Sequence, residues 1–402
     1  MRIAVVSTFY SPGMGYTENC LPAALARQGH EVHLITSRLN VYGNAPDYDR
    51  NYASFLGPSE VDAGSHERDG YQVHRLAYRL MGGYVALRGI TGLLRRLAPD
   101  IVHSTAVVSL ASYAIAALRP IANFRFFTEC HQHLSVVRPY LLHDGGGHRA
   151  KRAVFRLTRT LPGSLVGLAS ERCYAIAPDC ARVAIDLYGI PAGKVSVQPL
   201  GTDTVLFRPC LNQRELTERA LARAALGYPL DAIVCVYTGR LTEEKNPLLL
   251  AEAVSRLAAN GQPFYSLFVG EGMQREAILA LRNSTILPFM AHSKLAEVYR
   301  MADVAVWPRQ ESMSMLDAAA SALPIVASSS IGDPDRIIGN GALYAENDVI
   351  SLMSVLRALA DPRKRIALGA AGRRKMEDYY SWDAIAVTLT HEYEQALMRA
   401  RT

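Results

Sequence analysis

Apolar and polar positions alternate along the first half of the chain in short blocks. Compact apolar runs predict buried strands at "RIAVVST" (2–8), "EVHLITS" (31–37) and "DIVHSTA" (100–106). Between the first two, "TENCLPAALARQGH" has helical spacing and reaches Gly29, a residue typical of a helix C-terminus. The polar stretch 38–70 predicts a long loop or insertion. Short apolar runs separated by helical patterns predict a parallel sheet with crossover helices.

The same pattern restarts in the second half and is more regular there. Strands are predicted at "AIVCVYTG" (232–239), "YSLFVGEG" (265–272), "VAVWP" (304–308) and "PIVASSS" (324–330), with helical patterns between them. Two consecutive α/β sheets of this kind predict two doubly wound domains that face a central cleft. Ligands of such sheets bind beyond the carboxyl ends of the strands. The closing stretch 379–400 predicts a helix that packs back across the cleft.

Composition agrees with a globular protein that has two cores. Half of the 402 residues are apolar and 20% are charged. No stretch of eighteen or more apolar residues lacks charge, and the first apolar run is too short for a secretory signal. The six cysteines are scattered, and their spacing does not predict a zinc site. We therefore expect reduced thiols in a cytoplasmic protein.

The positive charge of the chain is concentrated in one segment. The net charge is +6, and residues 148–163 ("HRAKRAVFRLTRTLPG") interleave basic and apolar positions. The basic residues there are Arg149, Lys151, Arg152, Arg156 and Arg159. Such a helix can lie on an anionic membrane surface, at the inner face for a cytoplasmic protein. The simpler alternative is a solvated helix with its apolar side in the core. No nucleic-acid-binding module accompanies the charge, so we expect no nucleic acid partner.

Two cations follow the first strand of the second half. Arg240 and Lys245 lie in "GRLTEEKN", where the apolar run ends. An arginine can grip two oxygens at once, and a lysine acts as a point charge, so the pair suits a diphosphate. An ordinary solvated loop is the alternative for these charges.

The stretch "WPRQESMSMLDAAASALPIV" (307–326) combines a loop carboxylate with a helix start. Glu311 lies in the loop, and helical spacing begins near Ser314, which places Asp317 in the first turns. Such a carboxylate can accept hydrogen bonds from ribose or sugar hydroxyls, and amides at a helix start can face phosphate. Stabilisation of the helix dipole is the alternative role for Asp317.

Glycines and histidines mark the strand ends of the first half. Gly13 and Gly15 in "YSPGMGY" allow backbone amides to approach an anion, although a plain tight turn needs the same residues. His103 lies in "DIVHSTA", and His131 and His133 follow the apolar run "FRFFTEC" (124–130), which predicts a further strand. Each histidine alone fits a hydrogen-bonded core position, but together they suggest an acceptor site.

Taken in order along the chain, these segments resemble glycosyltransferase family 4, the retaining sugar-nucleotide transferases with the GT-B fold. The resemblance rests on "GMGYTENCLPAALARQGHEVHLIT", "PDIVHS", "YAIAPDCARVAIDLYGIPAGKVSVQPLGTDTVLFRP", "TGRLTEEKNP", "FVGEG", "YRMADVAVWP", "LDAAASALPIV" and "YSWDAIA". It implies an acceptor-binding Rossmann-like domain over 1–198 that the helix 383–402 joins. A donor-binding Rossmann-like domain would cover 199–382.

The resemblance also implies residue roles. Arg240 and Lys245 would hold and stabilise the donor's diphosphate, Glu311 would contact the transferred sugar, and Asp317 would hold the ribose. His131 would lie at the reacting face of the sugar and complete the catalytic set with Arg240, Lys245 and Glu311. The implied donor site further includes Gly15, Ser312, Met313, Ser314 and Met315. The implied acceptor side consists of Gly13, Gly15, Tyr16, His103 and His133.

The sequence departs from the family in one loop. The family has two glutamates separated by seven residues; here Asp317 takes the second position, and counting back reaches Arg309. The turn "ESMS" is about two residues shorter than the family's glycine-containing turn, which indicates a reshaped sugar-binding loop.

The implied reaction moves a hexose-type sugar from a nucleotide diphosphate sugar to a hydroxyl of a glycan or lipid-linked acceptor, with retained configuration. No cofactor and no metal are expected. A sugar-nucleotide epimerase, a phosphorylase or a non-catalytic scaffold of the same fold are the alternatives.

Overall fold

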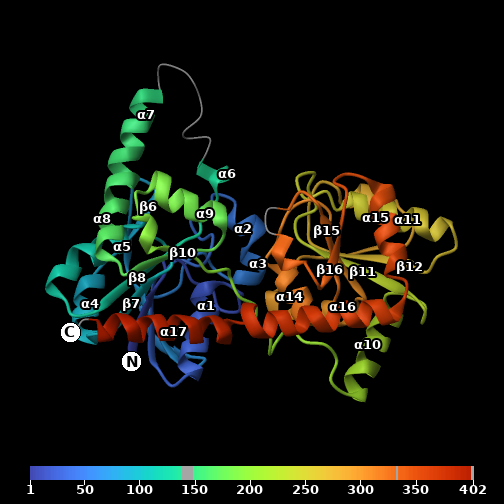
Figure 1. Cartoon of the computed structure of the whole chain (residues 1–402), viewed down its shortest axis with the longest axis horizontal. Coiled ribbons are helices and arrows are strands. Elements are labelled where there is room, and N and C mark those ends of the chain that lie inside the picture. The colour runs from blue at the N-terminus through green and yellow to red at the C-terminus, as the bar shows by residue number, and fades with distance from the viewer. Residues whose placement is uncertain (138–147, 332–333, 400–402) are drawn as a thin grey trace. The chain divides into compact units, whose positions relative to one another are not determined.

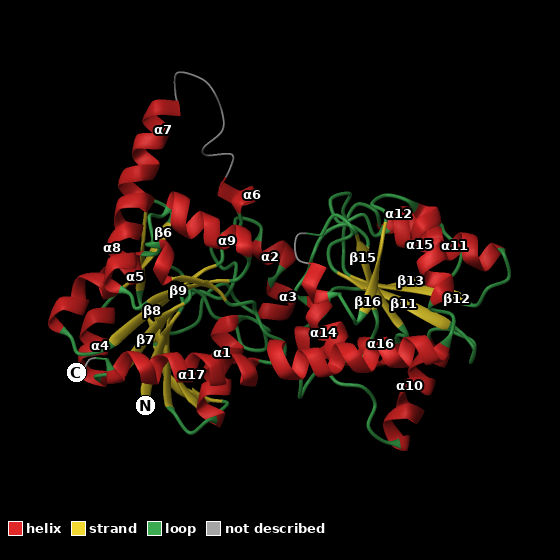
Figure 2. Ribbon diagram, in the orientation of Figure 1, coloured by secondary structure: helices red, strands yellow, loops and turns green. Residues whose placement is uncertain are grey.

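The computed structural model describes residues 1–137, 148–331 and 334–399 of the chain. The chain divides into two compact units (Figure 1), an N-terminal unit of Met1–Leu200 with Ile385–Thr402 and a C-terminal unit of Gly201–Ala384. These bounds lie close to those that the sequence suggests. Each unit is a mainly parallel sheet with helices packed against it (Figure 2).

The N-terminal unit contains an eight-stranded sheet with the order β10-β9-β8-β7-β1-β2-β4-β3. Its strands are β1 (Arg2–Val6), β2 (Glu31–Ser37), β3 (Gly64–Arg68), β4 (Tyr71–Leu76), β7 (Ile101–Ser104), β8 (Arg125–Cys130), β9 (Arg172–Ala175) and β10 (Val195–Val197). All neighbours are parallel except β3 and β4. Because β1 lies between β2 and β7, the chain reverses its direction of travel across the sheet there. Ligands of open α/β sheets bind at such a switch point.

Helices of the N-terminal unit follow the strands that the pattern predicts. Outside the stretch 38–70 they include α1 (Thr17–Arg27), α4 (Ile90–Leu97), α5 (Leu110–Leu118), α6 (Leu134–Val137), α7 (His148–Phe155), α8 (Leu161–Ala169) and α9 (Pro178–Arg182). A π-helical turn, Arg156–Thr160, joins α7 to α8. The last helix, α17 (Trp382–Met398), runs into this unit from Ile385 onward. The unit's core is apolar, with Ile115, Phe126 and Val166 fully buried.

The C-terminal unit contains a six-stranded sheet with the order β13-β12-β11-β14-β15-β16, and all pairs are parallel. Its strands are β11 (Ile233–Thr238), β12 (Phe264–Val269), β13 (Ser284–Leu287), β14 (Val304–Trp307), β15 (Ile325–Ser328) and β16 (Gly341–Tyr344). Its helices are α10 (Gln213–Ala225), α11 (Leu248–Ala259), α12 (Arg275–Leu279), α13 (Leu295–Met301), α14 (Ser314–Ala320), α15 (Val349–Ala358) and α16 (Pro362–Lys375). Here the switch point lies between β11 and β14.

The stretch 38–70 is more ordered than its composition predicts. It contains α2 (Tyr48–Asn51), α3 (Ala53–Leu56) and β3, which pairs with β4. Its tyrosines pack on one another, since the rings of Tyr42 and Tyr52 stack with centroids 4.6 Å apart. The side-chain amide of Asn40 donates to the carbonyl of Pro58 at 2.7 Å and closes the segment. Of the two expectations for this stretch, the long loop is therefore wrong, and the insertion stays a prediction.

Strand β4 covers only the first part of the apolar stretch "YQVHRLAY" (71–78). It ends at Leu76, and the chain continues into a two-stranded hairpin of β5 (Tyr78–Met81) and β6 (Tyr84–Leu87). Gly82 and Gly83 have φ values of 56° and 83° at the turn, a left-handed conformation that glycine adopts without strain.

Candidate functional site

Glycines interlock the two loops that end β11 and β12 in the C-terminal unit. An added Cβ on Gly270 would lie 2.0 Å from the carbonyl oxygen of Gly239, and one on Gly272 would lie 2.3 Å from that of Leu241. The amide of Leu241 donates to the carbonyl of Glu271 at 2.9 Å. Only glycine allows this approach of one backbone to another. The loop that carries Arg240 and Lys245 is therefore fixed by its neighbour.

Lys245 faces the loop after β14. Its Nζ donates to the carbonyl oxygen of Glu311 at 3.1 Å. Burial and the nearby Arg240 lower the pKa of Lys245, while Glu311 and Glu244 act in the opposite direction. Arg240 is placed differently, because its side chain is 70% exposed and lies 3.8 Å from Glu244. The hydroxyl of Tyr237 donates to the carbonyl of Arg240 at 2.8 Å and holds its backbone.

Arg309 is a third cation at this edge, and the sequence reasoning gave it no role. Its Nη1 donates to the carbonyl oxygen of Glu243 at 3.4 Å, and its Nε lies 3.3 Å from Glu346. Arg309 thus joins the loop after β14 to the loop after β11. Arg309 takes the position where the family has the first of its two glutamates, counted back from Asp317, and this was the signal that could have identified it.

The carboxylate of Asp317 is turned into the C-terminal unit. Asp317 is 4% exposed; its Oδ1 accepts from the hydroxyl of Thr202 at 2.7 Å, and its Oδ2 lies 2.9 Å from Nε2 of His292. Burial alone would lower the pKa of His292, but the hydrogen bond and charge of Asp317 raise it above the ordinary value. A ribose hydroxyl would have to share these oxygens with Thr202 and His292.

The turn between Glu311 and Asp317 closes on itself. The hydroxyls of Ser312 and Ser314 lie 2.7 Å apart, and the amide of Ser312 donates to Sδ of Met315 at 3.5 Å. Met315 is 2% exposed and belongs to the core of the unit, and Met313 packs against that core. The Met315 side chain is taken up by packing, so only its backbone could face a donor, and its place in the donor site stays a prediction.

A chain of hydrogen bonds links β7, β8 and α17 in the N-terminal unit. Nε2 of His131 lies 2.5 Å from one oxygen of Glu129, and Nε2 of His103 lies 2.8 Å from the other. Nδ1 of His103 lies 2.5 Å from the hydroxyl of Tyr393. The side chain of His103 is 0% exposed, so an acceptor cannot touch it. The prediction of His103 as an acceptor-side residue is corrected to a core position behind Glu129.

His131 is the accessible end of this chain, with a side chain 34% exposed. Burial alone would lower its pKa, but the hydrogen bond and charge of Glu129 outweigh burial and raise it above the ordinary value. Burial acts to raise the pKa of Glu129, yet the hydrogen bonds from His103 and His131 outweigh burial and hold it at about 2. Glu129 was missed, although a glutamate inside the apolar run "RFFTEC" is an evident signal.

Glu18 is a second missed carboxyl group, in the first turn of α1. Burial raises its pKa to about 7, while the charge of His131 opposes the shift and that of Glu129 adds to it. The predicted glycine turn lies just before this helix, with Gly13 at φ 80°. The hydroxyl of Tyr16 lies 2.9 Å from that of Tyr42. The carboxyl ends of β1 and β8 thus bring Glu18 and His131 together.

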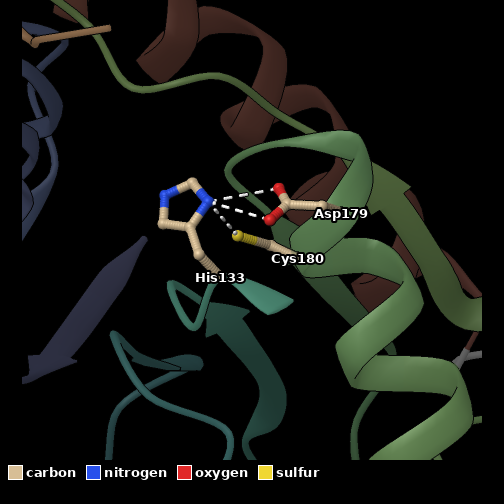
Figure 3. Close-up of side chains that lie close together, drawn as sticks. All are labelled: His133, Asp179 and Cys180. Carbon is tan, nitrogen blue, oxygen red and sulfur yellow. Dashed lines mark hydrogen bonds and ion pairs between the residues drawn. The ribbon is translucent and has the colours of Figure 1, made fainter. Parts of the chain in front are cut away.

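His133 turns to other partners than His131. Its Nδ1 lies 3.0 Å and 3.2 Å from the two oxygens of Asp179 and 3.6 Å from Sγ of Cys180 (Figure 3). The backbone amide of Leu134 donates to the same carboxylate at 3.1 Å. The sequence gave no sign of this cluster, because 46 residues separate His133 from Asp179.

The fold and these loops define a two-domain α/β protein with charged residues at both switch points. A model of "Glycosyltransferase Family 4" matches residues 21–206, and a model of "Glycosyl transferases group 1" matches residues 232–361. The two models occur in the order of the two units and cover most of the chain. The chain belongs to this family of glycosyltransferases, as the resemblance of its motifs predicts.

Individual relatives agree with this assignment. D-inositol 3-phosphate glycosyltransferase from Kineococcus radiotolerans is 30% identical over 259 residues, which are 57% of this chain and 58% of that protein. The chain thus spans a little more than half the length of the curated relatives that it matches.

Solved structures show the fold. Sucrose-phosphate synthase from Thermosynechococcus elongatus has a TM-score of 0.66 at 21% identity, with 99% of this chain and 100% of that chain covered. HepE from Anabaena in complex with UDP has a TM-score of 0.65 at 14% identity, with 98% and 100% covered. The predicted GT-B class, with two parallel-sheet α/β domains, is confirmed. Among the described residues, no helix is long and apolar enough to cross a membrane.

Proposed function

We propose that this protein transfers a hexose-type sugar from a nucleoside diphosphate sugar to an acceptor hydroxyl, with retained anomeric configuration. The observation that carries the proposal is the contact of Lys245 with the turn after β14, at 3.1 Å, at the switch point of the C-terminal sheet. Arg309 connects the same two loops. Family membership supports the transferase chemistry, and a structural neighbour crystallised with UDP supports a nucleotide donor.

The electrostatics at this edge suit a leaving diphosphate. Transfer builds positive charge on the sugar ring and negative charge on the departing phosphate. Lys245 and Arg309 are fixed cations, and Arg240 is an exposed one that a bound donor could draw away from Glu244. Preorganised charges stabilise such a transition state by several kcal/mol per group. We propose that these cations replace a divalent metal in the donor site and that no cofactor is needed.

The N-terminal unit supplies the acceptor side in this proposal. His131 lies beside Glu18 and Glu129 at the carboxyl ends of β1 and β8 and would contact the reacting sugar. A glycan or a lipid-linked glycan is the acceptor class that we favour, and inositol phosphate is the alternative that the name of the Kineococcus relative suggests.

A surface on α7, α8 and the π-helical turn between them supports attachment to an anionic membrane at the inner, cytoplasmic face. Five apolar side chains there are between 55% and 66% exposed and follow one another at intervals of three or four residues: Val154, Leu157, Leu161, Leu165 and Leu168. Arg152 and Arg156 are exposed on the same helical segment. The structure does not describe the side chains of Arg149 and Lys151, two further basic residues of the predicted helix. An apolar stripe with flanking arginines matches the interfacial region of an acidic bilayer.

The donor assignment is tested with Lys245→Ala, Arg309→Ala and Arg240→Ala, and with Lys294→Ala as a matched control. Lys294 is an exposed lysine of the same unit that pairs with Glu297. We expect UDP, GDP or ADP to raise the melting temperature of the wild type. Loss of a charged hydrogen bond of about 1.5–3 kcal/mol predicts roughly 10-fold to 100-fold weaker binding for Lys245→Ala. Unchanged affinity in Lys245→Ala and Arg309→Ala would refute the diphosphate site.

Product analysis with a labelled donor separates the possible reactions. A transferase requires an acceptor, an epimerase does not, and a phosphorylase requires inorganic phosphate. If the cationic side chains stabilise the diphosphate without a metal, addition of Mg²⁺ or Mn²⁺ should leave the rate unchanged. A strict requirement for either ion would contradict the proposal that these side chains replace a metal.

Membrane attachment is tested by sedimentation with vesicles of phosphatidylglycerol and of phosphatidylcholine. The wild type should sediment with the anionic vesicles at low salt, and Leu161→Asp with Leu165→Asp should abolish sedimentation. Leu230→Asp is the control, since Leu230 is 98% exposed in the C-terminal unit. Equal sedimentation of the wild type and the double variant would refute membrane attachment through this surface.

A further inference from the structure

Three side chains with metal-binding atoms meet beside the N-terminal sheet. His133 follows β8, and Asp179 and Cys180 belong to α9, so two separate segments supply them. The three side chains point toward one another in Figure 3, and their ligand atoms all lie within 4.8 Å of one another. This cluster is outside the proposed donor site, which lies in the C-terminal unit.

The separations agree with those around a tetrahedral zinc ion. Zinc binds nitrogen and oxygen at about 2.0–2.2 Å and sulfur at about 2.3 Å, which separates a nitrogen and an oxygen ligand by about 3.3 Å and a nitrogen and a sulfur ligand by about 3.5 Å. Nδ1 of His133 lies 3.0 Å and 3.2 Å from the oxygens of Asp179 and 3.6 Å from Sγ of Cys180. Only small side-chain movements would be needed to admit the ion.

The chemistry of the atoms favours an ion over hydrogen bonding alone. Nδ1 of His133 carries one proton at most, yet it faces two carboxylate oxygens and a sulfur. Imidazole, thiolate and carboxylate together suit zinc, whereas magnesium and calcium prefer oxygen ligands alone.

Access to the cluster is from the solvent side. The side chains of His133 and Asp179 are 48% and 39% exposed, while Cys180 is fully buried. An ion could therefore enter over the histidine and carboxylate, reach the sulfur at the bottom, and keep one coordination position for water.

We propose that His133, Asp179 and Cys180 form a zinc-binding site with water as the fourth ligand. Binding forms three protein–zinc bonds and releases the thiol proton of Cys180 to solvent. The ion would tie the segment after β8 to the start of α9. Because His131 lies two residues before His133, the ion would also limit the movement of the accessible end of the Glu129 hydrogen-bond chain. The sequence expectation of no metal ligand set would then hold for the donor site only.

The test uses the full chain, stripped with a chelator and then loaded with Zn²⁺ or Co²⁺ alone. We expect one equivalent of zinc to remain after dialysis. Cobalt should give a thiolate-to-metal charge-transfer absorption together with the visible bands of a tetrahedral ion. His133→Ala, Asp179→Asn and Cys180→Ser should each weaken zinc binding by more than the roughly 10-fold to 100-fold typical of changes outside the ligand set. Cys180→Ser should also abolish the charge-transfer band.

Matched controls are Cys210→Ser and Asp186→Asn. Cys210 is a partly exposed thiol of the C-terminal unit, and Asp186 is an exposed carboxylate near α9. Both controls should bind zinc as the wild type does. Absence of retained zinc, equal affinity in the three ligand variants, or a cobalt spectrum without thiolate absorption would overturn the proposal and leave an ion pair beside a buried thiol. If Cys180→Ser does not fold, the wild-type cobalt spectrum and the zinc affinity of His133→Ala still test the site, because His133→Ala alters only an exposed ring.

Discussion

Replacing Glu129 with glutamine removes the negative charge that two histidines share. Glu129 is 6% exposed, and its oxygens lie 2.8 Å from His103 and 2.5 Å from His131. Burial opposes the charged form, but the two hydrogen bonds overcome this cost and lower the pKa from 4.5 to about 2. A depression of this size corresponds to about 3 kcal/mol in favour of the folded, charged state.

We therefore expect Glu129→Gln to lower the free energy of unfolding by about 2–3 kcal/mol at pH 7. The sign with pH follows from the depressed pKa in the folded state. The contribution of Glu129 is present above its ordinary pKa of 4.5 and is lost as pH falls through about 2. The difference between wild type and variant should accordingly shrink between pH 4.5 and pH 2. The pKa of His131 should fall in the variant, because Glu129 raises it.

Urea unfolding at pH 7 and pH 3 measures the stability difference, and NMR titration of the His131 ring measures its pKa. Glu171→Gln is the control, since Glu171 is a 25% exposed carboxylate paired with Arg125 and should contribute less than about 1 kcal/mol. A variant that unfolds within about 0.5 kcal/mol of the wild type, with an unmoved His131 titration, would show that the hydrogen-bond chain does not hold the charge as described.

Three further outcomes follow from the structure. Gly272→Ala places a Cβ 2.3 Å from the carbonyl of Leu241 and should lower the free energy of unfolding by about 2–4 kcal/mol, whereas Gly193→Ala, with open space around it, should change it by less than about 1 kcal/mol in a urea titration. Asp317→Asn should lower the pKa of His292, which Asp317 raises above 6.5 in the folded protein. The stabilisation of the fold by protonated His292 is complete below pH 6.5 and is lost as pH rises through the raised pKa. The melting temperatures of wild type and variant should therefore converge at alkaline pH. Maleimide labelling of the native protein should modify Cys20 and Cys210 before the four buried thiols, and mass spectrometry of peptides measures the order; early labelling of Cys173, whose pKa burial raises to about 12, would contradict the described core.

The sequence by itself determined the architecture of the C-terminal unit closely. Its strands β11, β12, β14 and β15 lie where short apolar runs occur, because a parallel strand that is buried on both faces must be apolar throughout. The position of Lys245 could also be predicted, since a residue that follows a parallel strand lies at the ligand edge of the sheet. Periodicity is a local signal, and local signals place elements along the chain.

In the stretch 38–70, polar composition predicted a loop, but packing between side chains makes the segment ordered. The tyrosines of the stretch 38–70 resemble loop residues in a sequence, but Tyr42 and Tyr52 stack and Tyr48 is 3% exposed. The partners of these rings lie in the same stretch, where Tyr48 also contacts Tyr52 and donates to the carbonyl of Gly57, but no apolar periodicity marks these contacts in the sequence.

Only the tertiary structure decided which side chains face a ligand. His103 and His131 look alike in the sequence, yet one is enclosed between Glu129 and Tyr393 while the other keeps an exposed edge. Tyr393 lies 290 residues from His103, and Asp179 lies 46 residues from His133. The direction and charge of a side chain depend on such distant neighbours through burial and hydrogen bonding. The sequence therefore specifies where strands end, and folding specifies which of the residues at those ends remain available for chemistry.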